Sequence, residues 1–167
     1  MPSMKVEGLD EVYSKLKALT DGNAIEAVQK HAVFKGMEQI KQEVEAQIRA
    51  IPEQEGYVNV KKGEPPRSVI TRREKEQLLK HLGISRMEEK NGAIYNSISF
   101  DGYTDIKTKK YPNGIPAVLI ARSINSGSSV RQKKPFVRSA KSAAKGKAIK
   151  AATDAALESL SEIMEGR

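Results

Sequence analysis

The longest regular feature of the chain is an apolar face that repeats at helical spacing between Asn23 and Pro52. This spacing predicts a helix over about 24–50, because residues three and four apart share one side of a helix. Asn23 is expected to cap its start. Pro52 ends it, since the residue before a proline avoids helical angles. Gly36 weakens this helix by about 1 kcal/mol relative to alanine, so we expect it to mark a close crossing.

A second long apolar face follows Pro135, a residue that suits the first turn of a helix. It predicts a helix that nearly reaches the C-terminus, with the face Phe136, Ala140, Ala144, Ile149, Ala152, Ala156, Leu160 and Ile163. Alanine there allows another backbone to approach closely. The central helix alone is about 40 Å long, too long for a small sheet to cover. We therefore expect one of its ends to pack on another subunit.

Two shorter helices are predicted near the start and in the middle of the chain. Residues 4–20 fit a short strand followed by a helix with one apolar stripe, which Gly22 ends. Thr71 and Glu74 have the spacing of a capping box. They predict a charged helix over 72–82, which Gly83 closes.

After residue 92 the period of the apolar positions changes to two. Ile94, Ile98 and Phe100 then fall on one side of a predicted strand over 93–100. Further short strands are expected at 57–60 and 104–109.

The segment before the C-terminal helix is less regular. Residues 111–114 combine proline, asparagine and glycine after a tyrosine, which predicts a turn. Residues 115–125 fit both a helix and a strand. The helical period is slightly favoured, with Pro116 in the first turn.

These patterns predict an α+β fold, in which a small antiparallel sheet is packed by the long central helix and the long C-terminal helix. A length of 167 residues suits one domain over 1–167. Residues 53–70 and 101–114 are rich in turn residues and lack a clear period, so we expect irregular, mobile loops there.

The net charge of +8 is unevenly distributed. Between Ile106 and Thr153 there are twelve Lys or Arg and no Asp or Glu. Such a block indicates an anionic neighbour, either nucleic acid or an acidic face of another protein subunit. A solvated helix face is the plainer alternative. No apolar run has the length of a membrane span or resembles a signal peptide, so we expect a cytoplasmic protein and no membrane partner.

The sequence does not favour an enzyme. It has no cysteine, and His31 and His81 are too isolated to build a histidine-rich metal site. No spacing suggests a nucleophile with its base, so no catalytic residue, metal or cofactor is expected. The rival class is a basic nucleic-acid-binding protein. The chain lacks the interleaved aromatic residues of a single-strand platform, and it shows no zinc-finger or RNA-recognition signature.

Four stretches, taken in order, resemble a known family. They are Met4–Asp10, the helix end at Ala50-Ile51-Pro52, the segment Phe100–Gly114, and Ser126-Gly127-Ser128 followed by Pro135–Ala140. The last stretch is similar to a "P-F-[LIV]-R-P-A" pattern, with Ser139 in place of the second proline. The chain thus resembles the tail-completion, or head–tail joining, proteins of long-tailed bacteriophages, in particular those from phages and prophages of Gram-positive bacteria.

This resemblance implies a structural protein that completes or joins the tail at the head–tail interface and has no enzyme activity. It implies a homo-oligomeric ring in the virion, and it leaves open whether the isolated protein is a monomer. It also implies partners among the other neck and tail proteins, namely the adaptor, the stopper and the tail tube. The protein would lie in the bacterial cytoplasm during assembly. Weak contact with the passing DNA is compatible with this role.

Two groups of residues are expected to serve the assembly. Basic loops are expected to face acidic surfaces on neighbouring subunits, because charge complementarity sets partner choice and encounter rate. This subunit or partner interface comprises Lys107, Lys109, Lys110, Tyr111, Gly127, Ser128, Arg131, Lys133 and Lys134. Solvated lysines that contribute little are the alternative. The structural anchor of the last helix is expected to be Pro135, Phe136 and Arg138.

Overall fold

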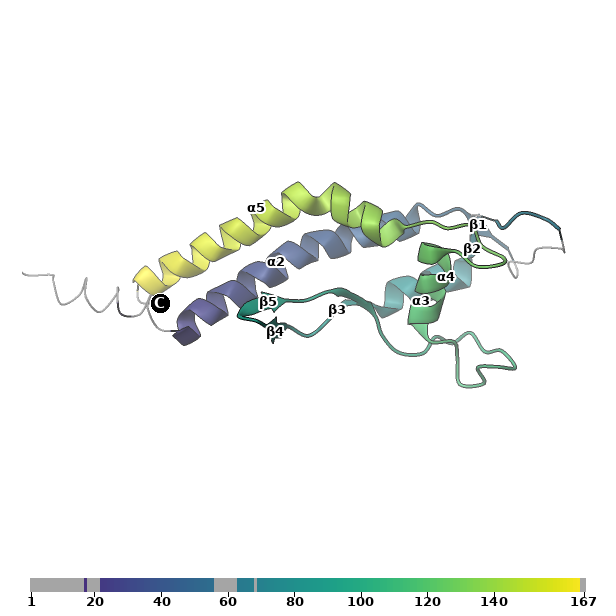
Figure 1. Cartoon of the computed structure of the whole chain (residues 1–167), viewed down its shortest axis with the longest axis horizontal. Coiled ribbons are helices and arrows are strands. Elements are labelled where there is room, and N and C mark those ends of the chain that lie inside the picture. Colours follow the sequence, from purple (N-terminus) through teal and green to yellow (C-terminus); the bar gives the residue numbers. More distant parts are fainter. Residues whose placement is uncertain (1–16, 18–21, 56–62, 68, 166–167) are drawn as a thin grey trace, which may run out of the picture.

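The computed structural model describes residues 17, 22–55, 63–67 and 69–165. Two long helices dominate it, α2 (Gly22–Arg49) and α5 (Phe136–Glu165). They lie side by side and run in opposite directions (Figure 1). Both helices were predicted, with ends close to those observed. The strand and helix predicted over 4–20 and the strand predicted at 57–60 lie outside the described residues, apart from the helical residue Lys17.

Gly36 marks the crossing of the two helices, as predicted. A Cβ atom added there would lie 3.0 Å from the carbonyl oxygen of Ala148 and 3.3 Å from the Cβ of Ala152. The backbones approach this closely because only small residues stand at the contact. The helix already includes Gly22, however, so Asn23 lies within it and the prediction of Asn23 as its cap is wrong.

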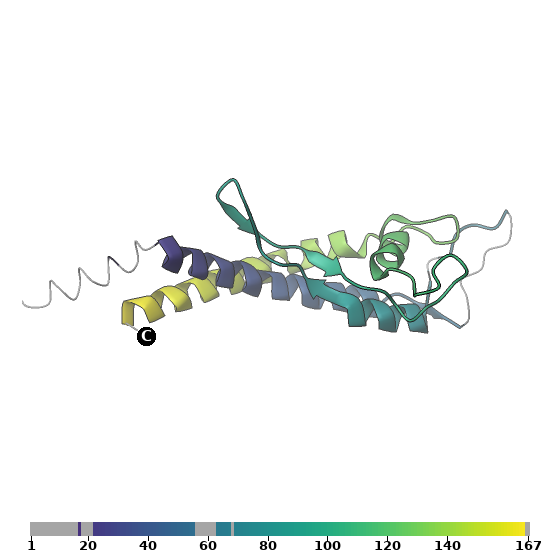
Figure 2. The ribbon, with the colours of Figure 1, turned by 90° about the horizontal axis from the view of Figure 1, so that it is seen from below.

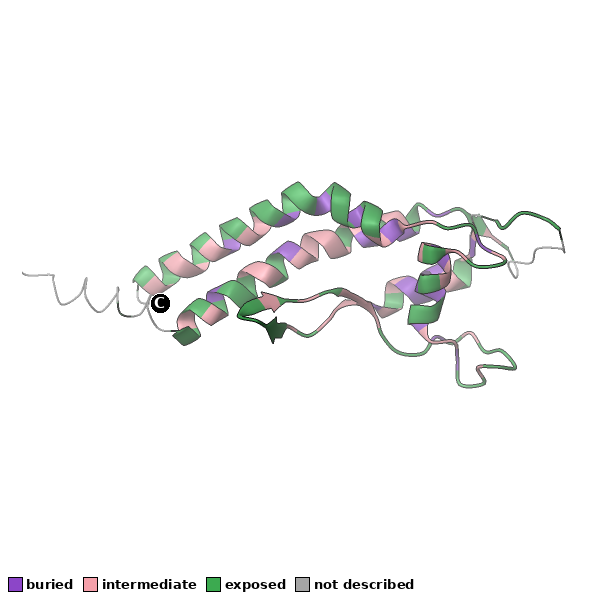
Figure 3. Ribbon diagram, in the orientation of Figure 1, coloured by how far each residue is buried: buried purple, intermediate pink, exposed green. Residues whose placement is uncertain are grey.

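The hydrophobic core is concentrated at one end of the helix pair, where α3 (Arg72–His81) and α4 (Ala117–Ser126) pack beneath the end of α2 and the start of α5. Figure 3 shows the buried positions gathering there. Phe136 is 1% exposed, and its ring meets that of Phe100 edge to face, with centroids 6.0 Å apart. At the far end of the pair, the described residues include few buried positions, such as Val28 and Ala155.

The buried face of α5 differs from the predicted face in its second half. Ala148 and Ala155 are buried, whereas Ile149 is 58% exposed. The prediction of Ile149 as a core residue is therefore wrong. Small alanines bring the two helices close together, and that geometry turns the larger neighbouring side chain away from the partner helix.

Within the described part of the chain, short strands form three two-stranded ladders. β1 (Glu53–Gln54) and β2 (Ile70–Thr71) are parallel; β3 (Leu82–Ile84) pairs with β6 (Ile98–Phe100), and β4 (Glu88–Lys90) with β5 (Ala93–Tyr95), both antiparallel. The α+β class is confirmed, with antiparallel ladders beside the long helices.

The predicted strand over 93–100 is divided into β5 and β6 by an irregularity in the ladder. Ile84 pairs with Ile98, but Glu88 pairs with Tyr95, so residues 85–87 face only 96–97. One extra residue on one strand is a bulge, which bends the ribbon. The β4–β5 hairpin projects from the helix pair in Figure 2. Asn91 and Gly92 close it with φ of 55° and 72°, the left-handed angles of a two-residue hairpin turn.

Two local predictions around α3 had different outcomes. The capping box is confirmed: the Glu74 backbone N–H donates to Thr71 Oγ1 at 3.1 Å, and the Thr71 N–H donates to the Glu74 carboxylate at 3.0 Å. Gly83 does not close the helix, because α3 ends at His81 and Gly83 lies in β3, paired with Ser99.

Residues 101–116 connect β6 to α4 without a regular element. The predicted strand over 104–109 is therefore wrong, and the mobility expected for 101–114 stays a prediction. The predicted helix over 115–125 is present as α4, with Pro116 at its cap. Among the residues that the structure describes, no helix combines the length and apolar character needed to cross a bilayer.

Candidate functional site

The loop that carries Lys107, Lys109 and Lys110 is closed at its base by backbone hydrogen bonds. The N–H and the hydroxyl of buried Thr104 both donate to the carbonyl oxygen of Ile115, each at 2.9 Å. The Ile115 N–H in turn donates to the Ile106 carbonyl at 2.9 Å. The two ends of the loop are therefore fixed to each other.

Gly114 is required for this closure. Its φ is +107°, and a Cβ atom there would lie 1.9 Å from the carbonyl oxygen of Thr104. No side chain fits at that distance, and the backbone angle itself favours glycine. The predicted turn at 111–114 thus brings Ile115 back to Thr104.

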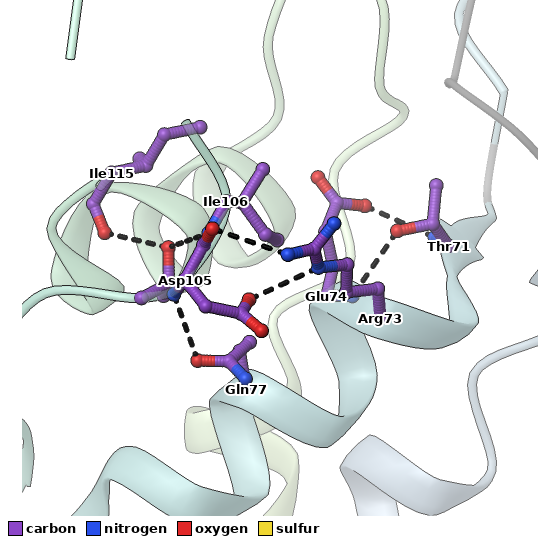
Figure 4. Close-up of polar contacts among 8 residues, drawn as sticks. Thr71, Arg73, Glu74, Gln77, Asp105, Ile106 and Ile115 are labelled. Atoms are coloured by element: carbon purple, nitrogen blue, oxygen red, sulfur yellow. Dashed lines mark hydrogen bonds and ion pairs between the residues drawn. The ribbon is translucent and has the colours of Figure 1, made fainter. Parts of the chain in front are cut away.

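Asp105 ties the same loop to α3 (Figure 4). The Arg73 guanidinium donates to the Asp105 carboxylate at 3.1 Å and to its backbone carbonyl at 3.2 Å. The Asp105 N–H donates to the Gln77 side chain at 3.2 Å. The Arg73 hydrogen bond lowers the pKa of Asp105 below its ordinary value, and the charges of Arg73 and Lys80 act in the same direction.

The tip of the loop presents its lysines outward. Lys107, Lys109 and Lys110 are exposed and form no ion pair with any described residue. The Lys110 ammonium lies 5.6 Å from the centre of the Tyr111 ring. Two backbone hydrogen bonds between Thr108 and Tyr111, of 3.2 and 3.1 Å, keep the tip tight. The lysine backbones are therefore held in place while their ammonium groups reach solvent.

The second basic loop, over 127–135, is also held by the backbone. Gly127 has φ +84°, and a Cβ atom there would lie 3.1 Å from the Lys133 nitrogen. The Ser128 N–H donates to the Arg131 carbonyl at 2.9 Å, and the Lys134 N–H donates to the Ile124 carbonyl at 2.8 Å. Gly127 thus allows a tight turn, while Lys133 remains exposed and Lys134 is half-buried.

Arg131 departs from its predicted position in an exposed loop. Its side chain is 10% exposed and forms an ion pair with Glu74 on α3. It also donates to the Ser123 hydroxyl on α4 at 3.0 Å. The guanidinium therefore joins the loop to two helices inside the molecule, and the prediction that Arg131 faces a neighbouring subunit is wrong, because the group is buried and already paired.

Lys75 is a buried cation that the sequence did not single out. Its ammonium donates to the Arg49 carbonyl at the end of α2 and lies 2.9 Å from the Glu53 carboxylate. A helix end carries unpaired carbonyl groups and partial negative charge, so a lysine is well suited to that position. The only local signal was a lysine within a helix rich in charges, which does not identify its distant partner.

A cleft of about 630 Å³ lies between the start of α3, the Asp105 loop and Arg131. Its cations are matched by anions: Arg72 pairs with Glu76, Arg73 with Asp105, and Arg131 with Glu74. The described lining holds no histidine, and the Thr71 hydroxyl serves the cap of α3. In the described ranges, no three His, Cys, Asp or Glu side chains are grouped to hold a metal ion. The charged side chains of this cleft thus form ion pairs with one another, and two of these pairs fix the loops to α3.

The predicted anchor of α5 divides into a buried and an exposed part. Phe136 fills the core, and the Pro135 carbonyl accepts from the Ser139 N–H at 3.0 Å in the first turn. Arg138 is exposed and forms no ion pair with the described residues, so the anchor is Pro135 and Phe136 without Arg138. Whether the loop lysines contact a partner stays a prediction.

Comparison with known proteins found no protein family, curated protein or solved structure that matches this chain.

Proposed function

We propose that the chain is a structural protein of a bacteriophage or prophage, which joins or completes the tail at the head–tail interface through protein–protein contacts in a ring. The sequence resemblance is the source of this proposal. The structural observation that supports it is the loop of residues 104–115, whose base is fixed to α3 while Lys107, Lys109 and Lys110 remain exposed and without an ion pair in the described part of the chain.

A fixed display of charge is suited to recognising another protein. Ordering a loop on binding costs free energy, and a loop that is already ordered avoids much of that cost. Complementary charge then directs encounter and disfavours wrong partners. The proposed partner surface is therefore an acidic face on a neighbouring subunit or another neck protein.

The helix pair supports the same role mechanically. α2 and α5 extend well past the core that contains Phe136 and Leu82 (Figure 1). Long helices packed through small residues form a stiff element that can place an interface at a distance from the loops. No step of this proposal requires a bond to be made or broken by the chain.

The proposal is tested on particles that lack the chain and are complemented with variants. Lys107→Glu, Lys109→Glu and Lys110→Glu, made together, reverse the charge of the loop and are expected to leave full heads and finished tails unjoined in electron micrographs. The matched control replaces the same lysines by arginine, which keeps the charge and is expected to join them. Heads and tails that join normally with the glutamate variant would contradict the proposal.

Nucleic-acid binding is the rival function, favoured by the net charge of +8. A protein that binds nucleic-acid phosphates displaces the cations that surround them. A higher salt concentration opposes this release, so the binding weakens steeply as salt is raised. A gel-shift assay over a range of salt concentrations separates the two functions. Tight, sequence-dependent binding that disappears in the glutamate variant would favour the rival, whereas negligible binding together with failed assembly would favour the joining role.

A further inference from the structure

The ribbon of β3–β4 and β5–β6 has one edge that no described residue pairs. The Ser85 N–H donates to the Ser97 carbonyl at 2.8 Å, and the Asp101 N–H donates to the His81 carbonyl at 3.1 Å. Residues 97 and 101 therefore face the other strand, and alternate residues of an antiparallel strand face outward. The N–H and C=O groups that point to the outer edge are those of Ile94, Asn96, Ile98 and Phe100.

The alternation continues without a break to the hairpin turn. A two-residue turn closes on the pair Lys90 and Ala93, so Ala93 also faces the other strand, as does Tyr95 opposite Glu88. The extra residue of the bulge stands in the strand over 82–90. The strand over 93–101 thus presents one regular outer edge, which we call the open edge.

The open edge lacks the protection that exposed strands usually have. Charged side chains commonly prevent an edge from pairing with another chain. The other strand has such charges at Arg86, Glu88, Glu89 and Lys90, whereas residues 93–100 include no charged side chain. A two-stranded ribbon is also only marginally stable by itself, and the β4–β5 end of this one projects from the helix pair (Figure 2). The ribbon is therefore suited to gaining a further strand.

The open edge has two defined ends. The hairpin turn at 91–92 lies at one end. At the other end, Tyr103 forms a bridge with Pro116, and the Ala117 N–H donates to the Gly102 carbonyl at 3.0 Å. The chain itself therefore occupies the edge beyond Asp101. A groove of about 520 Å³ lies at this junction, lined by Ile98–Tyr103, Pro116 and Val118.

We propose that the open edge pairs with the open edge of a second copy, in an antiparallel sheet of four strands with a two-fold axis at Ser97. Ala93 then lies opposite Asp101 of the second copy, and every outward backbone group from Ile94 to Phe100 gains a partner. The hairpin end of each copy reaches the groove beside Pro116 of the other. A shift in either direction would leave outward groups unpaired or would meet the bridge at Tyr103.

The side chains match in the same register. Ile98 and Phe100 pack against the core, and Ile94 lies on the same face because alternate side chains of a strand share a face. In the proposed pair, Ile94 lies opposite Phe100 of the second copy, which is a favourable apolar pair. On the other face, Tyr95 lies opposite Ser99 and Ser97 opposite Ser97. Apolar positions thus continue across the junction on one face, and polar positions continue on the other.

Charges at the two ends of the open edge are complementary. Lys90 lies beside Ala93 in the ribbon, and Ala93 lies opposite Asp101 of the second copy, so all three share one face. All three are exposed. The small Ala93 leaves a gap of two strand spacings, roughly 10 Å, which the long lysine side chain can cross toward the carboxylate. The antiparallel direction brings these two ends together, so the edge is complementary to itself.

This contact is distinct from the ring of the proposed function. A two-fold contact uses the same patch on both copies and closes on itself, whereas a ring needs two different patches in a head-to-tail contact. The open edge includes none of the loop lysines. Failure of the pairing in solution therefore leaves the joining role untouched, and failure of joining by the lysine variants leaves the pairing untouched.

The first experiment measures the mass of the full chain by sedimentation at micromolar to submillimolar concentrations. The wild-type chain is expected to form a dimer. Ser97→Glu places two like charges opposite each other at the axis, which destabilises a strand pair, and is expected to raise the dissociation constant at least about tenfold. Ser97→Lys is expected to do the same. Ser142→Glu, at an exposed position on α5, adds the same charge away from the edge and is expected to keep the dimer.

Mixing the two Ser97 variants tests the position of the axis. Opposite charges then face each other across the axis, so a dimer is expected to return in the mixture. A residue away from the axis does not meet its own copy and would not show this recovery. Circular dichroism checks that each variant keeps its helices. A monomeric wild-type chain over this concentration range, or a dimer that survives in both Ser97 variants alone, would overturn the proposal.

A second experiment tests the direction of pairing. The chain has no cysteine, so a single introduced cysteine can form a disulfide only with another copy. Ser97→Cys places two thiols at the axis and is expected to give a disulfide-linked dimer on oxidation. Ala93 is four residues away, so its two copies lie roughly 27 Å apart in the antiparallel pair, and Ala93→Cys is expected not to cross-link. Cross-linking at Ala93→Cys as readily as at Ser97→Cys would contradict the arrangement.

Discussion

The carboxylate of Glu74 joins two parts of the chain that lie 57 residues apart, because it accepts both from the Thr71 N–H and from the guanidinium of Arg131. The first contact caps α3, and the second holds the loop over 127–135 against that helix. Both side chains are nearly buried, at 10% and 13% exposure. The start of a helix and the position of a basic loop thus depend on one acidic side chain.

Removing Arg131 is expected to destabilise the protein strongly. Arg131→Ala leaves the buried Glu74 carboxylate without its cation, and the loss of one partner of a buried pair costs about 3–5 kcal/mol. Urea denaturation followed by circular dichroism measures the loss. The control is Arg72→Ala, because Arg72 pairs with Glu76 in an exposed position, where an ion pair contributes about 0–1 kcal/mol. Equal losses in the two variants would contradict the importance of the buried pair.

Two glycines in the long helices are expected to respond oppositely to substitution. A side chain at Gly146 meets nothing within 4 Å, whereas one at Gly36 meets Ala148. Gly146→Ala should therefore raise the free energy of unfolding by up to about 1 kcal/mol through helix propensity alone. Gly36→Val should lower it, since the helices must separate. The midpoints of thermal unfolding provide the comparison, and a stabilised Gly36→Val would disprove the close crossing.

Truncation of Phe136 is expected to loosen the end of the molecule that carries the loops. Phe136→Ala removes a buried ring that contacts Phe100, and such a change typically costs about 3–5 kcal/mol. Phe136→Leu keeps much of the volume and should cost less. Arg138→Ala, two residues along on the exposed side, should be close to neutral. Chemical denaturation of the three variants tests this order. A large loss in the free energy of unfolding for Arg138→Ala would show that Arg138 also anchors α5.

Asp105 is expected to make stability depend on acid pH. Arg73 lowers the pKa of Asp105 in the folded chain. The stabilisation is therefore present above the ordinary carboxyl pKa of about 4 and is lost as the pH falls through the lower folded value. Asp105→Asn should lower stability at neutral pH and reduce this acid dependence. In Arg73→Gln, NMR titration should show the pKa of Asp105 rising; an unchanged pKa would mean that Arg73 does not hold the carboxylate.

Much of the secondary structure could be predicted from the sequence because its signals are local. Helix ends at Pro52 and Pro135, the cap at Thr71 and the crossing at Gly36 each depend on the backbone chemistry of a few neighbouring residues. The short strands were harder to place. β3 and β4 have no clear alternation of their own, and the bulge that separates β5 from β6 arises from pairing with residues 85–87.

The candidate site was predicted only in part for the same reason. Exposed lysines in loops follow from charge and turn residues, and Lys107, Lys109 and Lys110 are exposed as predicted. Arg131 has a similar local sequence, in a basic loop, but its burial depends on Glu74, which is distant in the chain. No local pattern carries that information.

By itself, the sequence determined where the two long helices run, how α3 begins and which segment is basic, because periodicity, capping and charge are written in consecutive residues. The tertiary structure decided which cations are buried, which stripe of α5 faces α2 and which faces outward. Those outcomes depend on distances between segments: Ala148 fits against Gly36, so Ile149 turns to solvent, and Glu74 lies beside Arg131, so one cation of the basic region becomes part of the interior.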